Sequence, residues 1–195
     1  MIKKIAIALV AAVLNSLGVG LALPREWKIE QQVVIHRPPS RIHPLLFDLR
    51  RWQDWSVWTR AMDPQLRNTY EGPQDGVGSK WLWLGPKMGR GRIEIVAFDP
   101  QGRLDLDEAI ESDVVNAHAS IIFVAEGDST RVTWRDEGTL PPVVGGFFRG
   151  TVEAGLNENF STSLLKLKAI VEALPEPVAL PVAREVDAGI DAGAL

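Results

Sequence analysis

The segment AHASIIFVAEGDSTRVTWRDEG, residues 117–138, has the pattern of a β-hairpin. Residues 117–125 and 130–138 are rich in β-branched and aromatic residues, and the Glu-Gly-Asp-Ser sequence between them favours a turn. Side chains alternate along a strand, so Val132, Trp134 and Asp136 share one face of the second strand. Because Val132 and Trp134 are apolar, this pattern predicts that Asp136 also points toward the core.

Strand-like runs also occupy residues 79–84, 91–98 and 102–112, with Gly- and Pro-containing turns between them. Such short connections predict an antiparallel meander. An earlier run, WKIEQQVVI at 27–35, predicts a first strand, and Ser40 can cap a short helix that extends to about Leu49.

A long amphipathic helix is predicted from about Phe147 to Leu174. Its apolar residues recur at steps of three and four: Phe148, Val152, Leu156, Phe160, Leu164, Leu167, Val171 and Leu174. The stripe needs a partner surface, and the sheet is the only large one available. The sequence therefore predicts an α+β fold in which a curved antiparallel sheet wraps around a long C-terminal helix, with two short helices after the first strand.

The N-terminus has the pattern of a membrane segment. Lys3 and Lys4 precede an apolar run from Ile5 to Leu23, which Pro24 ends. As a helix this run covers about 28 Å, close to the thickness of a bilayer core and longer than most secretory signals. We expect an uncleaved anchor with the domain on the periplasmic or extracellular side. The alternative is a cleaved signal peptide and export.

The predicted organisation is an anchor or signal at 1–24, a domain at 25–174 and a disordered tail at 175–195. The chain of 195 residues has no cysteine, which excludes disulfides and a lipoprotein anchor. It has 21 basic and 25 acidic residues, a net charge of −4, which argues against nucleic acid as a partner.

This order of elements, with four sequence segments, resembles the START-like (SRPBCC) superfamily, the helix-grip proteins grouped with polyketide cyclases and lipid-transfer domains. The segments are VVIHRPPSRIHPLLFDLRRWQDWSVW (33–58), GVGSKWLW (76–83), STRVTWRDEG (129–138) and LLKLKAIVEAL (164–174). One departure is Ser129, where relatives often have glycine. The resemblance implies an apolar ligand cavity between sheet and helix, but no particular reaction.

Aromatic and apolar side chains are the candidate ligand contacts, because small-molecule sites are mostly apolar. The candidates are Trp52, Trp55, Trp58, Trp81, Trp83, Val132, Trp134, Phe148 and Phe160. The alternative for each is a place in the core.

Three polar residues are weak candidates for catalysis. Asp136 is expected to face inward, whereas Glu94 shares a face with both apolar and basic neighbours, and His118 lies on a strand. The alternative for each acid is an exposed carboxylate paired with arginine. Neither a metal-binding motif nor a cofactor motif is present, so we expect no metal and no cofactor.

Three functions therefore remain open at this point. The first is binding, or transport, of a small hydrophobic molecule or lipid by a domain that the N-terminal helix holds at the membrane. The second is an enzyme of the cyclase or dehydrase kind that uses an inward acid. The third is a protein-interaction module in which Trp52, Trp55 and Trp58 form an exposed patch.

Overall fold

The computed structural model describes residues 1–99, 102–111 and 114–175. An N-terminal helix, α1 (Ile2–Ala22), leads through a short linker into the domain. The domain contains seven strands: β1 (Glu26–Ile35), β2 (Arg67–Glu71), β3 (Lys80–Gly85), β4 (Gly89–Asp99), β5 (Arg103–Ile110), β6 (Val115–Glu126) and β7 (Ser129–Thr139). Its helices are η1 (Pro39–Arg41), α2 (His43–Phe47), η2 (Leu49–Arg51), α3 (Trp52–Trp55) and the long α4 (Gly145–Ala173).

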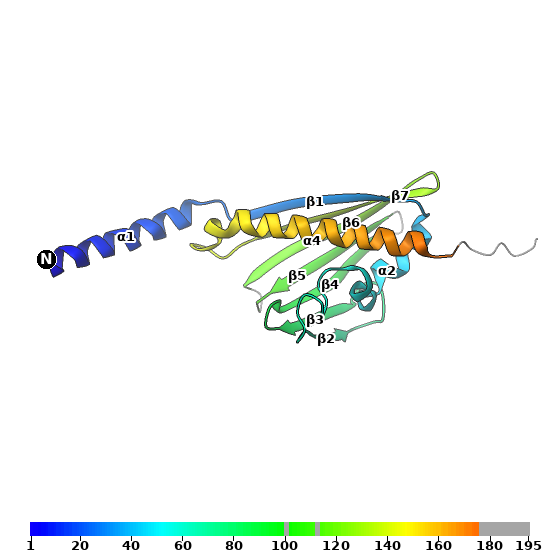
Figure 1. Cartoon of the computed structure of the whole chain (residues 1–195), viewed down its shortest axis with the longest axis horizontal. Coiled ribbons are helices and arrows are strands. Elements are labelled where there is room, and N and C mark those ends of the chain that lie inside the picture. Colours follow the sequence, from blue (N-terminus) through cyan, green and yellow to red (C-terminus); the bar gives the residue numbers. More distant parts are fainter. Residues whose placement is uncertain (100–101, 112–113, 176–195) are drawn as a thin grey trace, which may run out of the picture.

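The strands form one antiparallel sheet in the order β1-β7-β6-β5-β4-β3-β2. Consecutive strands from β2 to β7 are neighbours, and β1 pairs with β7, the last strand of the chain. Figure 1 shows the sheet with α4 running along it and the short helices near β2 and β3. The predicted meander, the long C-terminal helix and the α+β class are confirmed. The strand β2 was not predicted, because it is a short edge strand whose residues are mostly polar.

The predicted helix from Ser40 to Leu49 is divided into shorter pieces. Ser40 lies within η1 and does not cap α2, which begins at His43 and has Pro44 in its first turn. Asp48 is extended and ends α2, and its carboxylate accepts a hydrogen bond from the Arg50 backbone N–H, which starts η2. The prolines and the Asp48 cap therefore replace one helix with a sequence of short turns.

Only part of the α4 stripe is buried. Phe160, Leu164, Leu167 and Val171 are buried against the sheet, whereas Phe148 in the first turn is 61% exposed. The first turn of the helix therefore extends past the packed core, toward the side where α1 joins the domain (Figure 1). The predicted stripe is correct in its spacing but wrong in assigning Phe148 to the inner face.

Two cross-strand pairs place a tryptophan over a glycine. Trp83 on β3 pairs with Gly91 on β4, and Trp27 on β1 pairs with Gly138 on β7. A methyl group at either glycine would overlap the indole ring of its partner. Glycine in a strand often marks such a close approach. These two pairs fix the positions of two indoles on the inner face of the sheet.

The N-terminal helix is long and apolar enough to span a membrane, and it is the one such helix within the described part of the chain. It is almost entirely unburied and touches the domain only near its end, where Gly20 packs against Val143 and Phe147. The predicted tail lies outside the described residues from position 176 onward.

We predict opposite effects of alanine at two glycines. Gly91→Ala should lower the free energy of unfolding by about 1–3 kcal/mol, because the new methyl group displaces the Trp83 ring. Gly150→Ala, in open space within α4, should raise it by about 0.5–1 kcal/mol through helix propensity. Urea denaturation of the detergent-solubilised chain measures both. Equal effects at the two positions would contradict the role given to the Trp83–Gly91 pair.

Candidate functional site

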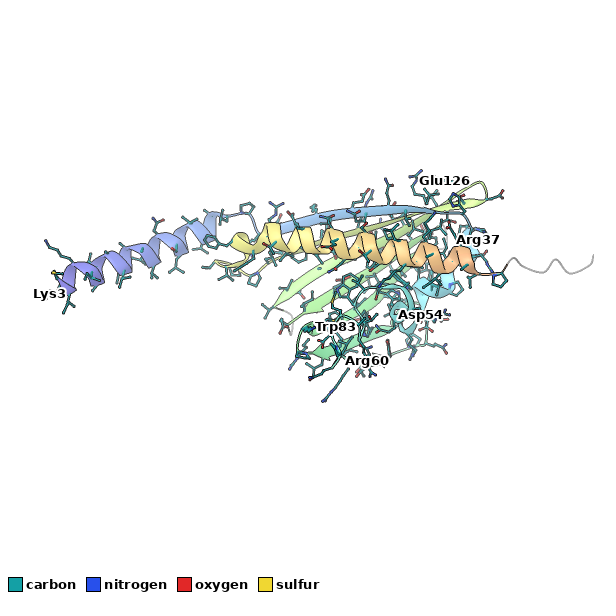
Figure 2. All side chains as sticks on the ribbon, viewed as in Figure 1. Lys3, Arg37, Asp54, Arg60, Trp83 and Glu126 are labelled. Atoms are coloured by element: carbon teal, nitrogen blue, oxygen red, sulfur yellow. The ribbon has the colours of Figure 1, made fainter. Side chains whose placement is uncertain are left out.

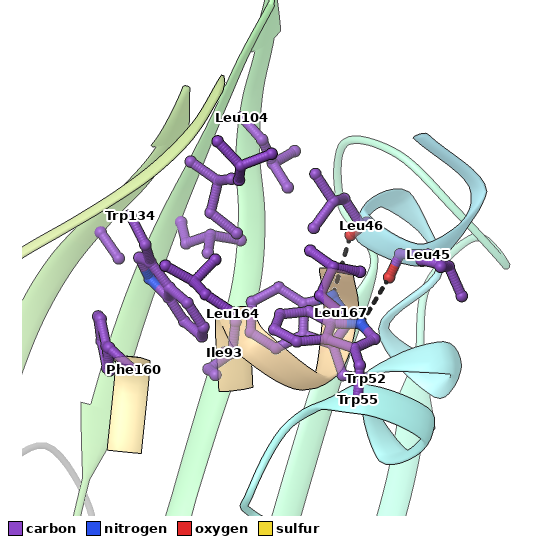
Figure 3. Close-up of a cluster of buried hydrophobic side chains, with 14 of the residues drawn as sticks. Leu45, Leu46, Trp52, Trp55, Ile93, Leu104, Trp134, Phe160, Leu164 and Leu167 are labelled. Carbon is purple, nitrogen blue, oxygen red and sulfur yellow. Dashed lines mark hydrogen bonds between the residues drawn. The ribbon is translucent and has the colours of Figure 1, made fainter. Parts of the chain in front are cut away.

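Trp52 and Trp55, on α3, pack against the inner face of the sheet. Both are fully buried, and their indole N–H groups donate to the backbone carbonyls of Leu46 and Leu45, each at 3.0 Å. Their rings meet Trp134 at centroid distances of 5.4 and 5.6 Å (Figure 3). With their polar groups satisfied and their rings enclosed, these two residues support Trp134.

A cavity of about 70 Å³ lies between the sheet and α4. Most of its wall is aromatic or aliphatic, and one carboxyl group interrupts it. Its lining residues are Trp58, Trp81, Trp83, Met88, Ile93, Glu108, Ile110, Trp134, Leu156 and Phe160. Five of the nine residues expected to contact a ligand lie here, namely Trp58, Trp81, Trp83, Trp134 and Phe160.

Aromatic contacts hold the back wall of the cavity in place. Phe160 of α4 stacks on Trp134 of β7 with centroids 4.0 Å apart and 29° between the rings. Trp58 packs edge-on against both rings, at 5.8 Å from Trp134 and 5.6 Å from Phe160. On the opposite side Trp81 donates its N–H to the Asn68 side chain at 3.1 Å. Because these rings brace one another, the wall is largely preformed.

The cavity opens at the edge of the sheet that carries the β3–β4 turn and the end of β5. Trp81, Ile93, Trp134 and Phe160 are at most 5% exposed, whereas Met88, Glu108 and Ile110 near this edge are partly exposed. Asp63 holds the β3–β4 turn, because its carboxylate accepts hydrogen bonds from the backbone N–H groups of Lys87 and Met88 at 2.8 and 3.0 Å. These bonds lower the pKa of Asp63 against the opposing effect of burial. The mouth therefore has a fixed rim on one side.

Asp136 and Glu108 place two carboxyl groups on the inner face of the sheet. Asp136 is 4% exposed and accepts a hydrogen bond from the indole N–H of Trp27. Glu108 pairs with Ala117, which pairs with Gly138 across β6 and β7. The indole of Trp27 covers Gly138 and donates to Asp136, so it lies on the inner face beside both small residues.

Desolvation dominates the electrostatics of this pair. Burial raises the pKa of Asp136 to about 6, although the hydrogen bond from Trp27 opposes the shift. Burial also raises the pKa of Glu108 well above its usual range, and the negative charge of Asp136 adds to this effect. None of the described residues forms an ion pair with Glu108. The geometry thus creates a carboxyl group that favours its protonated form beside an apolar cavity.

The arrangement matches a known family. The family described as polyketide cyclase/dehydrase and lipid transport matches residues 26–172. The chain belongs to this family. It is a START-like (SRPBCC) protein, as its sheet and long C-terminal helix also indicate.

Solved structures share the fold at low sequence identity. Protein CV1439 from Chromobacterium violaceum is 17% identical, with a TM-score of 0.56 over 78% of this chain and 100% of that one. TTHA0849 from Thermus thermophilus is 21% identical, with a TM-score of 0.56 over 74% and 97%. Norcoclaurine synthase from Thalictrum flavum, solved with dopamine and hydroxybenzaldehyde, is 13% identical, with a TM-score of 0.55 over 81% and 94%. No curated protein matches. At these identities the likeness shows the fold of the family alone.

The remaining candidates lie away from the cavity. Glu94 is on the outer face of the sheet, where Arg92 and Lys80 lie 2.7 and 3.2 Å from its carboxylate. His118 is also on the outer face, 2.8 Å from Asp107. Glu94 thus has the position of the alternative given for it, a carboxylate paired with arginine, and neither residue faces the cavity.

Two further apolar candidates lie outside the cavity, whereas one acid that the sequence analysis did not single out lines it. Val132 is buried in the core without lining the cavity, and Phe148 points outside it. Glu108 was missed, although the alternation along β5 of Leu104, Leu106, Glu108 and Ile110 indicates an inward position. Among the described residues there is no group of three or more His, Cys, Asp or Glu side chains that could hold a metal ion.

We predict that Asp136 makes stability depend on pH. The raised pKa means that the folded state binds more protons than the unfolded state between about pH 4 and pH 6, so the free energy of unfolding falls as pH rises through this window. Relative to Asp136→Asn, the unmodified chain should lose about 2–3 kcal/mol over that range. Urea denaturation at a series of pH values tests this, and a constant difference between the two proteins would contradict it.

Proposed function

We propose that this protein binds a small hydrophobic ligand in the cavity between its sheet and α4. The observation that supports this proposal is the cavity itself, because its aromatic side chains pack against one another and still leave an unfilled space. Apolar surface that a ligand covers contributes about 25 cal/mol per Å² before ordering costs. Family membership supports ligand binding as the general role.

The size and lining of the cavity suggest the character of the ligand. Ligand pockets usually enclose about 300–1,000 Å³, so a cavity of about 70 Å³ fits a small ring or a short branched chain. A lipid chain would need α4 or the mouth turns to move outward. When protonated, the Glu108 carboxyl can donate a hydrogen bond, which favours a ligand whose single polar group is a carbonyl or hydroxyl oxygen.

The location that we propose is the membrane surface. The helix α1 is long and apolar enough to serve as an anchor, and Lys3 and Lys4 at its start favour the cytoplasmic side for the N-terminus. The domain would then lie on the periplasmic or extracellular side. Cleavage of α1 as a signal peptide, followed by export, is the alternative.

Two leucines on α4 provide a matched test of ligand binding. Leu156→Trp fills the cavity, whereas Leu165→Trp adds the same side chain at a position that is 57% exposed. Binding of 5-fluoroindole, measured by ¹⁹F NMR on the detergent-solubilised chain, should weaken about tenfold or more in the first variant only, a loss of at least about 1.4 kcal/mol.

Native mass spectrometry of the purified chain complements this test by detecting any co-purified small molecule. Equal binding of the probe by Leu156→Trp and Leu165→Trp would place it outside the cavity. Together with the absence of a co-purified ligand, that result would overturn the proposal.

A second candidate function is proton-transfer catalysis. The specific observation is Glu108, a carboxyl group beside an apolar space with a raised pKa and no basic partner among the described residues. Such a group is a stronger base, once ionised, than an exposed glutamate, and perturbed carboxyl groups are frequent in active sites. The cavity would exclude water and shape the substrate.

We predict a Glu108-dependent reaction with the probe 5-nitrobenzisoxazole. The carboxylate removes the C3 proton while the N–O bond breaks, which releases a cyanonitrophenolate that is followed by absorbance. Glu108→Gln should lower the rate about 100-fold or more if Glu108 is the base. The control, Glu94→Gln on the outer face, should leave it unchanged. A rate that is the same in both variants would leave ligand binding without catalysis as the function.

The interaction-module hypothesis required an exposed patch of Trp52, Trp55 and Trp58. The first two are fully buried and the third is partly buried against Trp134 and Phe160. The patch on which that hypothesis depended is therefore not exposed.

A further inference from the structure

An exposed apolar patch lies between β7 and α4. We call Val143, Val144, Phe147 and Phe148 the turn patch. Val144, Phe147 and Phe148 are 52%, 53% and 61% exposed, and residues 140–148 contain no charged side chain. Contiguous exposed apolar side chains of this kind mark contact surfaces, and aromatic rings are enriched where proteins meet the membrane–water interface.

The turn patch is continuous with the end of α1. Gly20 lies so close to the carbonyl of Val143 and the ring of Phe147 that a methyl group at Gly20 would overlap the carbonyl. Gly146 makes a similarly close approach to Leu23. The patch therefore lies beside the last turn of α1, and the apolar surface of the helix passes directly into that of the patch.

The length of α1 determines the depth at which the turn patch would lie relative to a bilayer. Its 21 residues span about 31 Å, which matches the hydrocarbon core of a bilayer. Gly20 precedes the end of the helix by two residues, or about 3 Å. When α1 fills the core, Phe147 and Val143 consequently lie at the boundary between hydrocarbon and head groups.

The cavity mouth lies at the same end of the sheet. Thr139, at the end of β7, pairs with Glu26 at the start of β1 and with Asn116 at the start of β6. Ile110, at the end of β5, and the β3–β4 turn, which contains Met88, lie at this edge too. Figure 1 shows the β3–β4 turn on the side of the domain from which α1 extends, and in Figure 2 Lys3 and Glu126 lie on opposite sides of the molecule.

We propose that the turn patch inserts into the lipid surface beside α1 and holds the cavity mouth toward the bilayer. The occupant of the patch is bilayer lipid, because the patch continues the surface of a membrane-spanning helix. An apolar ligand then passes between membrane and cavity without crossing bulk water. The contact with lipid depends on retention of α1 and not on the identity of the ligand.

The absence of cysteine allows a depth measurement at single sites in the full chain. Phe148→Cys and Val144→Cys place a nitrobenzoxadiazole label in the turn patch, and Val124→Cys places it at a similarly exposed apolar position near the opposite end of the sheet. The labelled chains are reconstituted into vesicles of phosphatidylcholine and phosphatidylglycerol that contain a nitroxide-labelled lipid.

Nitroxide quenching and a blue shift of the label at positions 144 and 148, but not at 124, are the expected result. Labels in the patch that stay unquenched and open to aqueous iodide would overturn the proposal. So would labels protected from both quenchers, because that result indicates a protein partner. Since no ligand is added, failure of the ligand-binding test leaves this result unaffected, and the two proposals can fail separately.

Discussion

The stack of Phe160 on Trp134 is the contact on which the site depends. It joins α4 to β7 at a centroid distance of 4.0 Å, and β7 lies between β1 and β6 within the sheet. Trp52 and Trp55 support Trp134 from the side of the short helices, and their own N–H groups are bonded to α2. The stack therefore links the long helix, the sheet and the short helices at one point. It also forms the closed end of the cavity, so the same contact stabilises the fold and limits how far a ligand can enter.

The carboxyl groups of Asp136 and Glu108 are unfavourable for stability because they lie on the inner face of the sheet, as the stack does. A buried carboxylate without a basic partner is costly, and proteins reduce that cost by protonation or hydrogen bonding. Asp136 has the hydrogen bond from Trp27, and Trp27 can reach it because Gly138 has no side chain. Glu108 has no comparable partner among the described residues, and desolvation raises its pKa, which favours the protonated form. The raised pKa that makes Glu108 unfavourable for stability would be useful for ligand binding or catalysis. In its protonated form Glu108 could donate a hydrogen bond to a ligand, and in its ionised form it could remove a proton from one.

The sequence predicts the architecture well because period-two and period-3.6 patterns report directly on buried faces. It predicts the inward side of Asp136 for the same reason. It leaves the side of Glu94 open, because the register of β4 shifts between Ile95 and Ala97, so that Phe98 does not report on the face of Glu94. It fails at Phe148, since helical spacing identifies a stripe but not where the partner surface ends. The closeness of Glu108 to Asp136 depends on the register of three strands, and single-strand patterns contain no information about it.

Exposure of Phe147 and Phe148 is costly for a domain in water, yet the chain places them next to its most apolar segment. Val143, between them and β7, has φ of 70°, a conformation that is unfavourable for a β-branched residue. This conformation sets the turn in which the Val143 carbonyl meets Gly20 and Phe147 lies beside α1. A turn selected only to connect β7 with α4 would need neither the strained valine nor the exposed rings. Both features are understandable if the turn faces lipid, because there the rings are buried when α1 is in the membrane and the strain is offset by that burial.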